Sequence, residues 1–361
     1  MGQTFSSSSS SSSGPSAESL LAASMEGNLD QVKTLLGKLI ADSDNQSSLS
    51  SCVNTADPSG NTALHGAVFG GHLEVVKFLC ISCGADLLLK NSLGCSPLWI
   101  AAGYDKINCL EFLSQQLDAV GKLENMLMDT NTSGDTPFLA AASRGNIAAC
   151  KSMISLTETF SQTSDEASSW DLKRRMIRTV NNSGDTPLKV VVGEGHVELV
   201  TFLLQIDDEI SEKIHNIDSN NNNLQTKCIN TKNNNGLTPL IVACERNNVE
   251  IVKILLEYKA DVKTCDAKER NPLAVAAFCG CKDVVEYLLS NSSITTALIN
   301  EKDENGCTPL WLTSRTGDLA MVQLLIDAGA DATLKNNEGL SPEEVATKFK
   351  KEKVQQYFAE H

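Results

Sequence analysis

Cysteine and histidine are the residue types in this sequence whose side chains could hold a metal ion or act as nucleophiles. Cys80 and Cys83 form a CxxC pair, a spacing that suits half of a zinc site or a redox-active disulfide. No second CxxC pair and no histidine pair stands at zinc spacing, and Cys80 falls on an apolar position of a predicted helix. We therefore predict that these thiols, and those of Cys279 and Cys281, are structural, with no metal and no cofactor.

Motifs of catalytic sites are absent from the sequence. It contains no glycine-rich phosphate loop, no GxSxG, no HExxH and no protein-kinase motif set, and His215 and His361 lie in no recognisable context. The chain has 45 acidic and 30 basic side chains, a net charge of -15, which disfavours a nucleic-acid backbone as partner. The sequence therefore predicts a protein that is not an enzyme and does not bind nucleic acid.

A four-residue motif recurs along the chain and marks the structural elements on which the cysteines and histidines lie. Successive copies lie 33 to 52 residues apart. A recurring period of this size indicates stacked structural repeats and not one globular core. The copies are TALH from Thr62, SPLW from Ser96, TPFL from Thr136, TPLK from Thr186, TPLI from Thr238, NPLA from Asn271, TPLW from Thr308 and SPEE from Ser341.

Each part of the repeated unit has residue types that predict its local structure. Thr, Ser or Asn caps a helix, and the proline after it fits the first helical position, where its missing N–H costs nothing. Small residues follow, as in the run from Leu139, and a glycine such as Gly145 ends the helix in the left-handed conformation. A second segment, such as 197–204, carries apolar residues at helical spacing. The unit is thus predicted to be a pair of helices.

This pattern resembles the ankyrin repeat. The resemblance implies an all-α solenoid of about eight to nine stacked helix-turn-helix units with short hairpin turns between them. It covers residues 19–361, with capping repeats near 19–56 and 337–361. The longest steps place inserts near 157–179 and 207–227. The second insert holds a run of four asparagines and is predicted to be a disordered loop.

The first insert contains an amphipathic segment with two interpretations. Leu172, Met176, Ile177 and Val180 share a helical face with Trp170, whereas three arginines lie elsewhere on the helix. A basic amphipathic helix can bind a membrane surface or an acidic partner. The alternative, which we favour, is an extra helix that packs on the repeats and keeps its arginines in solvent.

Residues 1–18 form a predicted disordered tether ahead of the repeats. MGQTFS fits the pattern for N-myristoylation at Gly2, and a serine run follows from Ser6 to Ser13. One myristoyl chain binds membranes only weakly, and no second lipid or basic signal lies near it. There is no secretory signal and no apolar run of about 18 to 20 residues. We therefore predict a cytoplasmic protein with weak, reversible membrane association.

The resemblance also implies a function. Ankyrin repeats bind proteins through their hairpin tips and first-helix ends, so we predict a monomeric protein–protein interaction module that acts as adaptor, scaffold or regulator. By register the predicted contact residues are Phe69, Tyr104, Arg144, Glu194, Glu245, Arg246, Phe278 and Arg315. The alternative function is a myristoyl-tethered regulator whose lipid and basic helix near 170–180 set its location.

The family pattern further implies structural roles for three histidines. His65 occupies the histidine position of the TPLH motif, and His72 and His196 each follow a helix-ending glycine. Other residues replace the motif histidine in most copies, so the local hydrogen bonds are predicted to differ between repeats. These replacements include Trp99, Lys189, Ile241, Ala274 and Trp311.

Overall fold

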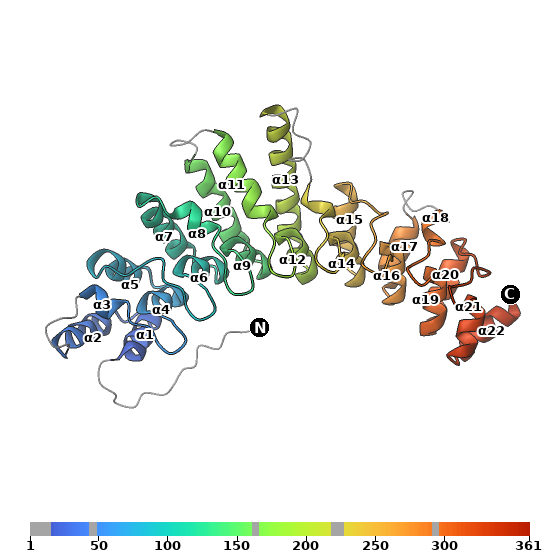
Figure 1. The fold of residues 1–361 in the computed structure, drawn as a ribbon, viewed down its shortest axis with the longest axis horizontal. Coiled ribbons are helices and arrows are strands. Elements are labelled where there is room, and N and C mark those ends of the chain that lie inside the picture. The colour runs from blue at the N-terminus through green and yellow to red at the C-terminus, as the bar shows by residue number, and fades with distance from the viewer. Residues whose placement is uncertain (1–15, 43–48, 161–165, 218–226, 291–295) are drawn as a thin grey trace. The chain divides into compact units, whose positions relative to one another are not determined.

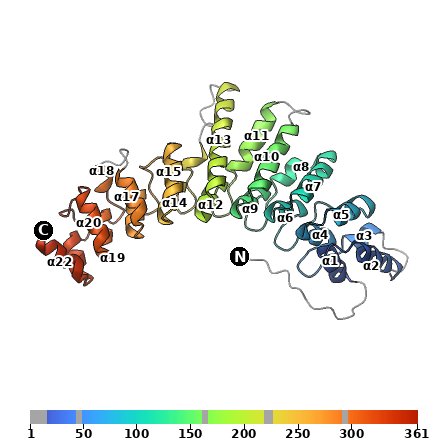
Figure 2. The same ribbon diagram turned by 180° about the vertical axis from the view of Figure 1, so that it is seen from behind.

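The computed structural model describes residues 16–42, 49–160, 166–217, 227–290 and 296–361. The chain divides into two compact units, Met1–Ser164 and Asp165–His361. In each unit, pairs of helices follow one another along a stack (Figures 1 and 2). Nine such pairs occur within the described ranges, which contain no strand and one isolated β-bridge between Ala56 and Thr62. The predicted all-α fold of stacked helix pairs is confirmed.

The first unit contains four helix pairs. They are α1 (Ala17–Met25) with α2 (Leu29–Asp42), α4 (Ala63–Gly70) with α5 (Leu73–Lys77) and its π-helical extension η1 (Phe78–Ser82), α6 (Pro97–Gly103) with α7 (Ile107–Ala119), and α9 (Pro137–Ser143) with α10 (Ile147–Phe160). Two short helices precede hairpins, namely α3 (Leu49–Val53) and α8 (Leu123–Leu127).

The second unit contains five helix pairs. They are α12 (Pro187–Glu194) with α13 (Val197–Ile217), α14 (Pro239–Glu245) with α15 (Val249–Glu257), α16 (Pro272–Phe278) with α17 (Lys282–Ser290), α19 (Pro309–Thr316) with α20 (Leu319–Asp327), and α21 (Pro342–Lys348) with α22 (Glu352–Glu360). Three further helices lie before hairpins or between repeats: α11 (Glu166–Arg178), the 3-10 helix η3 (Cys228–Asn230) and α18 (Thr296–Ile299).

The first helix of each pair begins where its cap residue dictates. In α9 the Thr136 hydroxyl accepts the backbone N–H of Leu139 at 3.2 Å, and Pro137 takes the first helical position. At the other end, Gly71 closes α4 with φ 80°, a left-handed conformation that a residue with a Cβ adopts only under strain. Because cap and terminator fix both ends, the same sequence position has the same place in every repeat.

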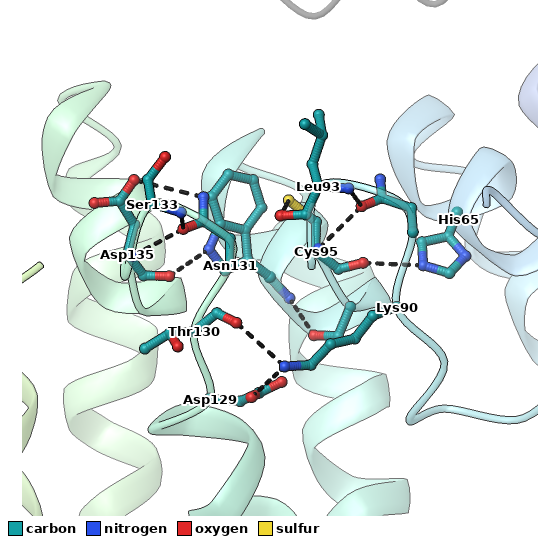
Figure 3. A network of polar contacts seen from close by, with 12 residues as sticks. His65, Lys90, Leu93, Cys95, Asp129, Thr130, Asn131, Ser133 and Asp135 are labelled. Carbon is teal, nitrogen blue, oxygen red and sulfur yellow. Dashed lines mark hydrogen bonds and ion pairs between the residues drawn. The ribbon is translucent and has the colours of Figure 1, made fainter. Parts of the chain in front are cut away.

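The hairpins before the first helices are built on an Asn or Asp side chain. Asn131 Oδ1 accepts the backbone N–H groups of Ser133 at 2.9 Å and Asp135 at 2.8 Å (Figure 3). Asn91, Asn181, Asn233, Asp266, Asp303 and Asn336 accept the equivalent two bonds. Backbone bonds also join successive tips, such as Thr132 N–H to the Leu93 carbonyl at 2.9 Å. The hairpins of each unit therefore form a continuous ladder.

The core of each unit is the layer of apolar side chains between successive repeats. Leu64 and Leu98 are 1% and 0% exposed in the first unit, and Leu188 and Leu273 are 0% and 1% exposed in the second. Each occupies the same position of its first helix, directly after the proline or its equivalent. One repeat alone would leave this side chain in water, so the stack supplies the core.

The two inserts differ from the sequence-based expectation. The first forms α11, and Leu172, Met176 and Ile177 are buried, as expected for a helix packed on the repeats. Val180 lies beyond the end of α11 and is 45% exposed, so its predicted place on the apolar face is wrong. The prediction that Arg178 points into solvent is also wrong, because it forms an ion pair with Asp207 on α13.

The predicted loop from 207 onward is partly helical. Helix α13 continues to Ile217, so the helix covers the first half of the second insert. Asp207 is an acceptor for both Arg178 and the Cys228 N–H, which gives this segment a packed environment that its polar sequence did not reveal. The asparagines at 220–223 lie outside the described residues, as do Gly2 and residues 1–15.

Candidate functional site

The eight predicted contact residues all lie at the ends of first helices. Tyr104, Arg144 and Arg246 are the C-caps of α6, α9 and α14, while the other residues stand on the last two turns of their helices. Phe69 and Tyr104 are half-buried, and the other six are exposed. Aligning the repeats therefore identified residues that occupy equivalent positions and are at least partly exposed to solvent.

In the first unit these residues join into one connected set. The rings of Phe69 and Tyr104 meet edge to face, with centroids 4.8 Å apart and an interplanar angle of 72°. The Arg144 guanidinium carbon lies 4.8 Å from the Tyr104 ring centroid and 5.4 Å from that of Trp99. We call Phe69, Trp99, Tyr104 and Arg144 the aromatic–arginine strip. It crosses three successive repeats.

Trp99 is the member of the strip that sequence reasoning did not select as a contact residue. Its ring is only 5% exposed, and its indole N–H donates to the Asp135 carbonyl at 2.9 Å. That bond fixes the ring between α6 and the following hairpin. In the sequence Trp99 aligns with the histidine of the motif, which gives no indication of a contact with Arg144. Only the three-dimensional structure shows that the Trp99 ring lies against the Arg144 guanidinium.

The motif histidine and its tryptophan replacements make the same bond. His65 Nε2 lies 3.1 Å from the Cys95 carbonyl (Figure 3), and the Trp311 indole N–H donates to the Leu340 carbonyl at 3.0 Å. Like Asp135, Cys95 and Leu340 each stand directly before the cap of the next repeat. The predicted difference in hydrogen bonding therefore does not apply to Trp99 and Trp311. By contrast, Lys189 Nζ pairs with Asp185 of its own hairpin at 2.7 Å.

His65 is held as a neutral side chain. It is fully buried, and burial lowers its pKa from 6.5 to about 4. Its Nδ1 lies 2.8 Å from the Thr62 hydroxyl and 3.1 Å from the Thr62 backbone nitrogen. His72 Nε2 lies 2.9 Å from the Met25 carbonyl of the preceding repeat. Both side chains join neighbouring segments, as a structural role requires.

In the second unit the contact residues pair with partners outside the predicted set. The Arg270 guanidinium carbon lies 5.5 Å from the Phe278 ring centroid, and Arg270 also donates to Asp266 Oδ2 at 2.6 Å. The Arg315 guanidinium carbon lies 5.2 Å from the ring centroid of Phe349. Phe278 and Phe349 remain 38% and 43% exposed. Phe349 is the C-cap of α21, so register counted into the last repeat would have identified it.

Burial acts on both thiols of the CxxC pair. All twelve cysteines are free, and burial raises the pKa of Cys80 to about 12 and raises the pKa of Cys83 as well. A thiol that is protonated at neutral pH is a poor nucleophile and a poor metal ligand. Across the ranges that the structure describes, no group of three or more His, Cys, Asp or Glu side chains is arranged to hold a metal ion. The described helices also include none that is long and apolar enough to cross a bilayer.

Comparison with known proteins gives matches in both units. The family model for ankyrin repeats (3 copies) matches residues 19–125 and 214–298, and the model for a single ankyrin repeat matches residues 305–337. The tyrosine-protein kinase HTK16 of Hydra vulgaris is 27% identical over 130 residues, which are 36% of this chain and 17% of the kinase.

Two further relatives are similar over shorter stretches. The human transient receptor potential cation channel subfamily A member 1 is 34% identical over 108 residues, 28% of this chain and 10% of the channel. A putative ankyrin repeat protein of Rickettsia bellii is 44% identical over 70 residues, 19% of this chain and 42% of that protein. The chain thus spans less than half the length of each of these relatives.

Proposed function

Because the chain belongs to the ankyrin repeat family, whose repeats are protein–protein interaction modules, we propose that it is a monomeric adaptor, scaffold or regulator. Its partner proteins bind to the hairpins and first-helix ends. The Hydra kinase and the human channel match over only 17% and 10% of their lengths, so their activities are not transferred to this chain. The proposed role is non-catalytic and cytoplasmic, and no nucleic acid takes part.

The observation that carries this proposal is the aromatic–arginine strip. Interface energy is concentrated in aromatic and arginine side chains that are already fixed before the partner arrives. Tyr104 is fixed between Phe69 and Arg144 yet keeps part of its surface in solvent. The other predicted contact residues, Glu194, Glu245, Arg246, Phe278 and Arg315, extend the proposed surface over the second unit.

Partner capture with matched variants tests this proposal. Proteins bound to the wild-type chain are identified by mass spectrometry, and Tyr104→Ala and Arg144→Ala are each expected to weaken binding of the same partner by about 2 kcal/mol or more. Glu111→Ala, an exposed change on α7, is the control and should leave binding unchanged. Circular dichroism verifies that all variants are folded. Unchanged partner binding by both strip variants would contradict the proposal.

The motif at Gly2 supports a second candidate, a myristoyl-tethered regulatory protein. A single acyl chain supports weak, reversible membrane binding. Leu172, Met176 and Ile177 of α11 are buried, so this helix is a poor candidate for the additional membrane contact. Labelling with a myristate analogue distinguishes the candidates, because Gly2→Ala should abolish labelling and membrane flotation. If flotation persists in Gly2→Ala, the tether is not the acyl chain.

A further inference from the structure

Arg144 differs from the arginines of this protein that form buried ion pairs. It is the single arginine in residues 1–164, and it is exposed. Arg178 and Arg270 use their guanidinium groups on the buried carboxylates of Asp207 and Asp266. Arg144 has no ion-pair partner in the described part of the chain, and its Nη1 donates only to the Ala140 carbonyl of its own helix at 3.3 Å. Most of its five N–H donors are thus available.

The packing around Arg144 fixes its guanidinium before any ligand binds. The group lies over both Tyr104 and Trp99, and the indole N–H of Trp99 is held by the Asp135 carbonyl. An arginine that stacks on a ring presents its N–H edge sideways in a planar fork that matches a carboxylate. Because its rotamer freedom is already reduced, less entropy is lost when a ligand binds.

We propose that Arg144 binds the carboxylate of an aspartate or glutamate side chain in a partner peptide, with an apolar side chain of the same peptide against Phe69 and Tyr104. This inference rests on the proposed function and names the chemistry of its partner. Charge complementarity carries the assignment, because an exposed, fixed cation without a counter-charge is placed beside the half-buried rings of an otherwise acidic unit.

The surroundings of Arg144 favour a carboxylate over a phosphorylated side chain. Proteins that bind phosphorylated peptides use clusters of arginines, whereas the first unit contains one. Asp105, directly after Tyr104, is exposed, and acidic residues outnumber basic ones in residues 1–164. A phosphate carries close to two negative charges and would be repelled more strongly than a carboxylate by this environment.

Selection from a random twelve-residue peptide library displayed on phage tests the proposal. The full-length wild-type chain is expected to enrich peptides with Asp or Glu at a fixed distance from an apolar residue. Arg144→Glu should lose this preference, and a synthetic acidic peptide from the selection should bind it at least about tenfold more weakly. Lys122→Glu, the same charge change at the exposed α7–α8 turn, should keep both the preference and the affinity.

Two synthetic peptides sharpen the result. Replacing the acidic residue of the selected peptide with lysine should abolish binding to the wild-type chain and restore binding to Arg144→Glu. Replacing it with phosphoserine should weaken binding to the wild-type chain, and tighter binding would overturn the carboxylate assignment. Arg144→Met keeps an apolar contact with the rings but lacks the fork, so it should lose the acidic preference while the chain remains folded.

The outcomes separate this inference from the proposed function. Enriched peptides without an acidic preference, or the same preference on Arg144→Glu, would overturn the assignment of Arg144 while protein binding stands. Failure to enrich any peptide would overturn the assignment as well. If partner capture also identified no protein that depends on Tyr104 or Arg144, the proposed function would fall with it.

Discussion

The guanidinium of Arg178 and the carboxylate of Asp207 form an ion pair with Nη2 2.6 Å from Oδ1, and their side chains are 15% and 2% exposed. Asp207 Oδ2 also accepts the backbone N–H of Cys228 at 2.9 Å. One carboxylate therefore connects α11, α13 and η3. The insert before the fifth repeat is joined to the repeats by a buried charge pair in addition to its apolar contacts.

Removing the charge of Asp207 should destabilise the second unit. In Asp207→Asn the partly buried Arg178 guanidinium loses the buried carboxylate that it pairs with, and breaking a buried pair typically costs about 3 to 5 kcal/mol. Urea unfolding followed by circular dichroism measures the change. Asp208→Asn is the matched control, because the Asp208–Lys227 pair is 40% and 44% exposed and should contribute at most about 1 kcal/mol. Equal effects of the two substitutions would contradict a specific role for the buried pair.

His65 should make stability depend on pH in the acidic range. Burial lowers its folded-state pKa to about 4, whereas the unfolded chain has the ordinary value of 6.5. Between these values the unfolded chain binds more protons, so stability is complete above pH 6.5 and declines as the pH falls toward 4. The expected loss over this window is on the order of 3 kcal/mol at most. Urea unfolding at a series of pH values measures it.

Substitutions at position 65 separate this effect from other titrating groups. His65→Gln should show a weaker pH dependence between pH 6.5 and 4 than the wild-type chain. His65→Trp should behave alike and also keep the bond to the Cys95 carbonyl, because Trp99 and Trp311 make that bond in their own repeats. If all three chains lost stability in parallel, another group would be responsible.

Leu188 and Glu194 lie on the same helix, α12, but truncating them should change stability by very different amounts. Leu188 is fully buried between repeats, so Leu188→Ala should cost about 2 to 5 kcal/mol and lower binding only through unfolding. Glu194 is exposed, and Glu194→Ala should change stability by no more than about 0.5 kcal/mol. Thermal melts of both variants provide the comparison. A stable Leu188→Ala protein would show that the stack is not the core.

The repeated fold was predictable because its determinants are local. Thr136, Pro137 and Gly145 specify the start and end of α9 through capping and backbone conformation, and neither depends on distant residues. The extension of α13 was not predictable in this way, since the polar sequence after Asp207 resembles a loop. Its helix is supported by Arg178 and Cys228, which are 29 and 21 residues away.

The candidate site was predictable in position but not in its contacts. Register alone placed Tyr104 and Arg144 at the ends of successive first helices. Arg144 stacks on Tyr104 and Trp99, which lie 40 and 45 residues before it in the sequence. These contacts depend on side-chain rotamers and on the distance between neighbouring repeats, and the sequence specifies neither. Arg270 was missed for the same reason, because it precedes the cap of α16 yet reaches Phe278 at the end of that helix.

The hairpin asparagine should tolerate aspartate but not alanine. Asn336 is 9% exposed, and its Oδ1 accepts the backbone N–H groups of Glu338 at 3.1 Å and Leu340 at 3.0 Å. Asn336→Ala removes both acceptors, and at about 1 kcal/mol for each bond the expected loss is about 2 kcal/mol. Asn336→Asp keeps the acceptor oxygen, and Asp266 and Asp303 already serve this role in other hairpins.

Urea unfolding of the two Asn336 variants distinguishes acceptor geometry from simple polarity. The Leu340 carbonyl that ends this hairpin also accepts the Trp311 indole N–H, so loosening the hairpin by Asn336→Ala should shift the fluorescence of the protein under native conditions. Asn336→Asp should leave both the fluorescence and the unfolding midpoint close to those of the wild-type chain. If the two variants were equally destabilised, the side-chain amide would be needed for its N–H donors, and the shared use of Asn and Asp in these hairpins would need another explanation.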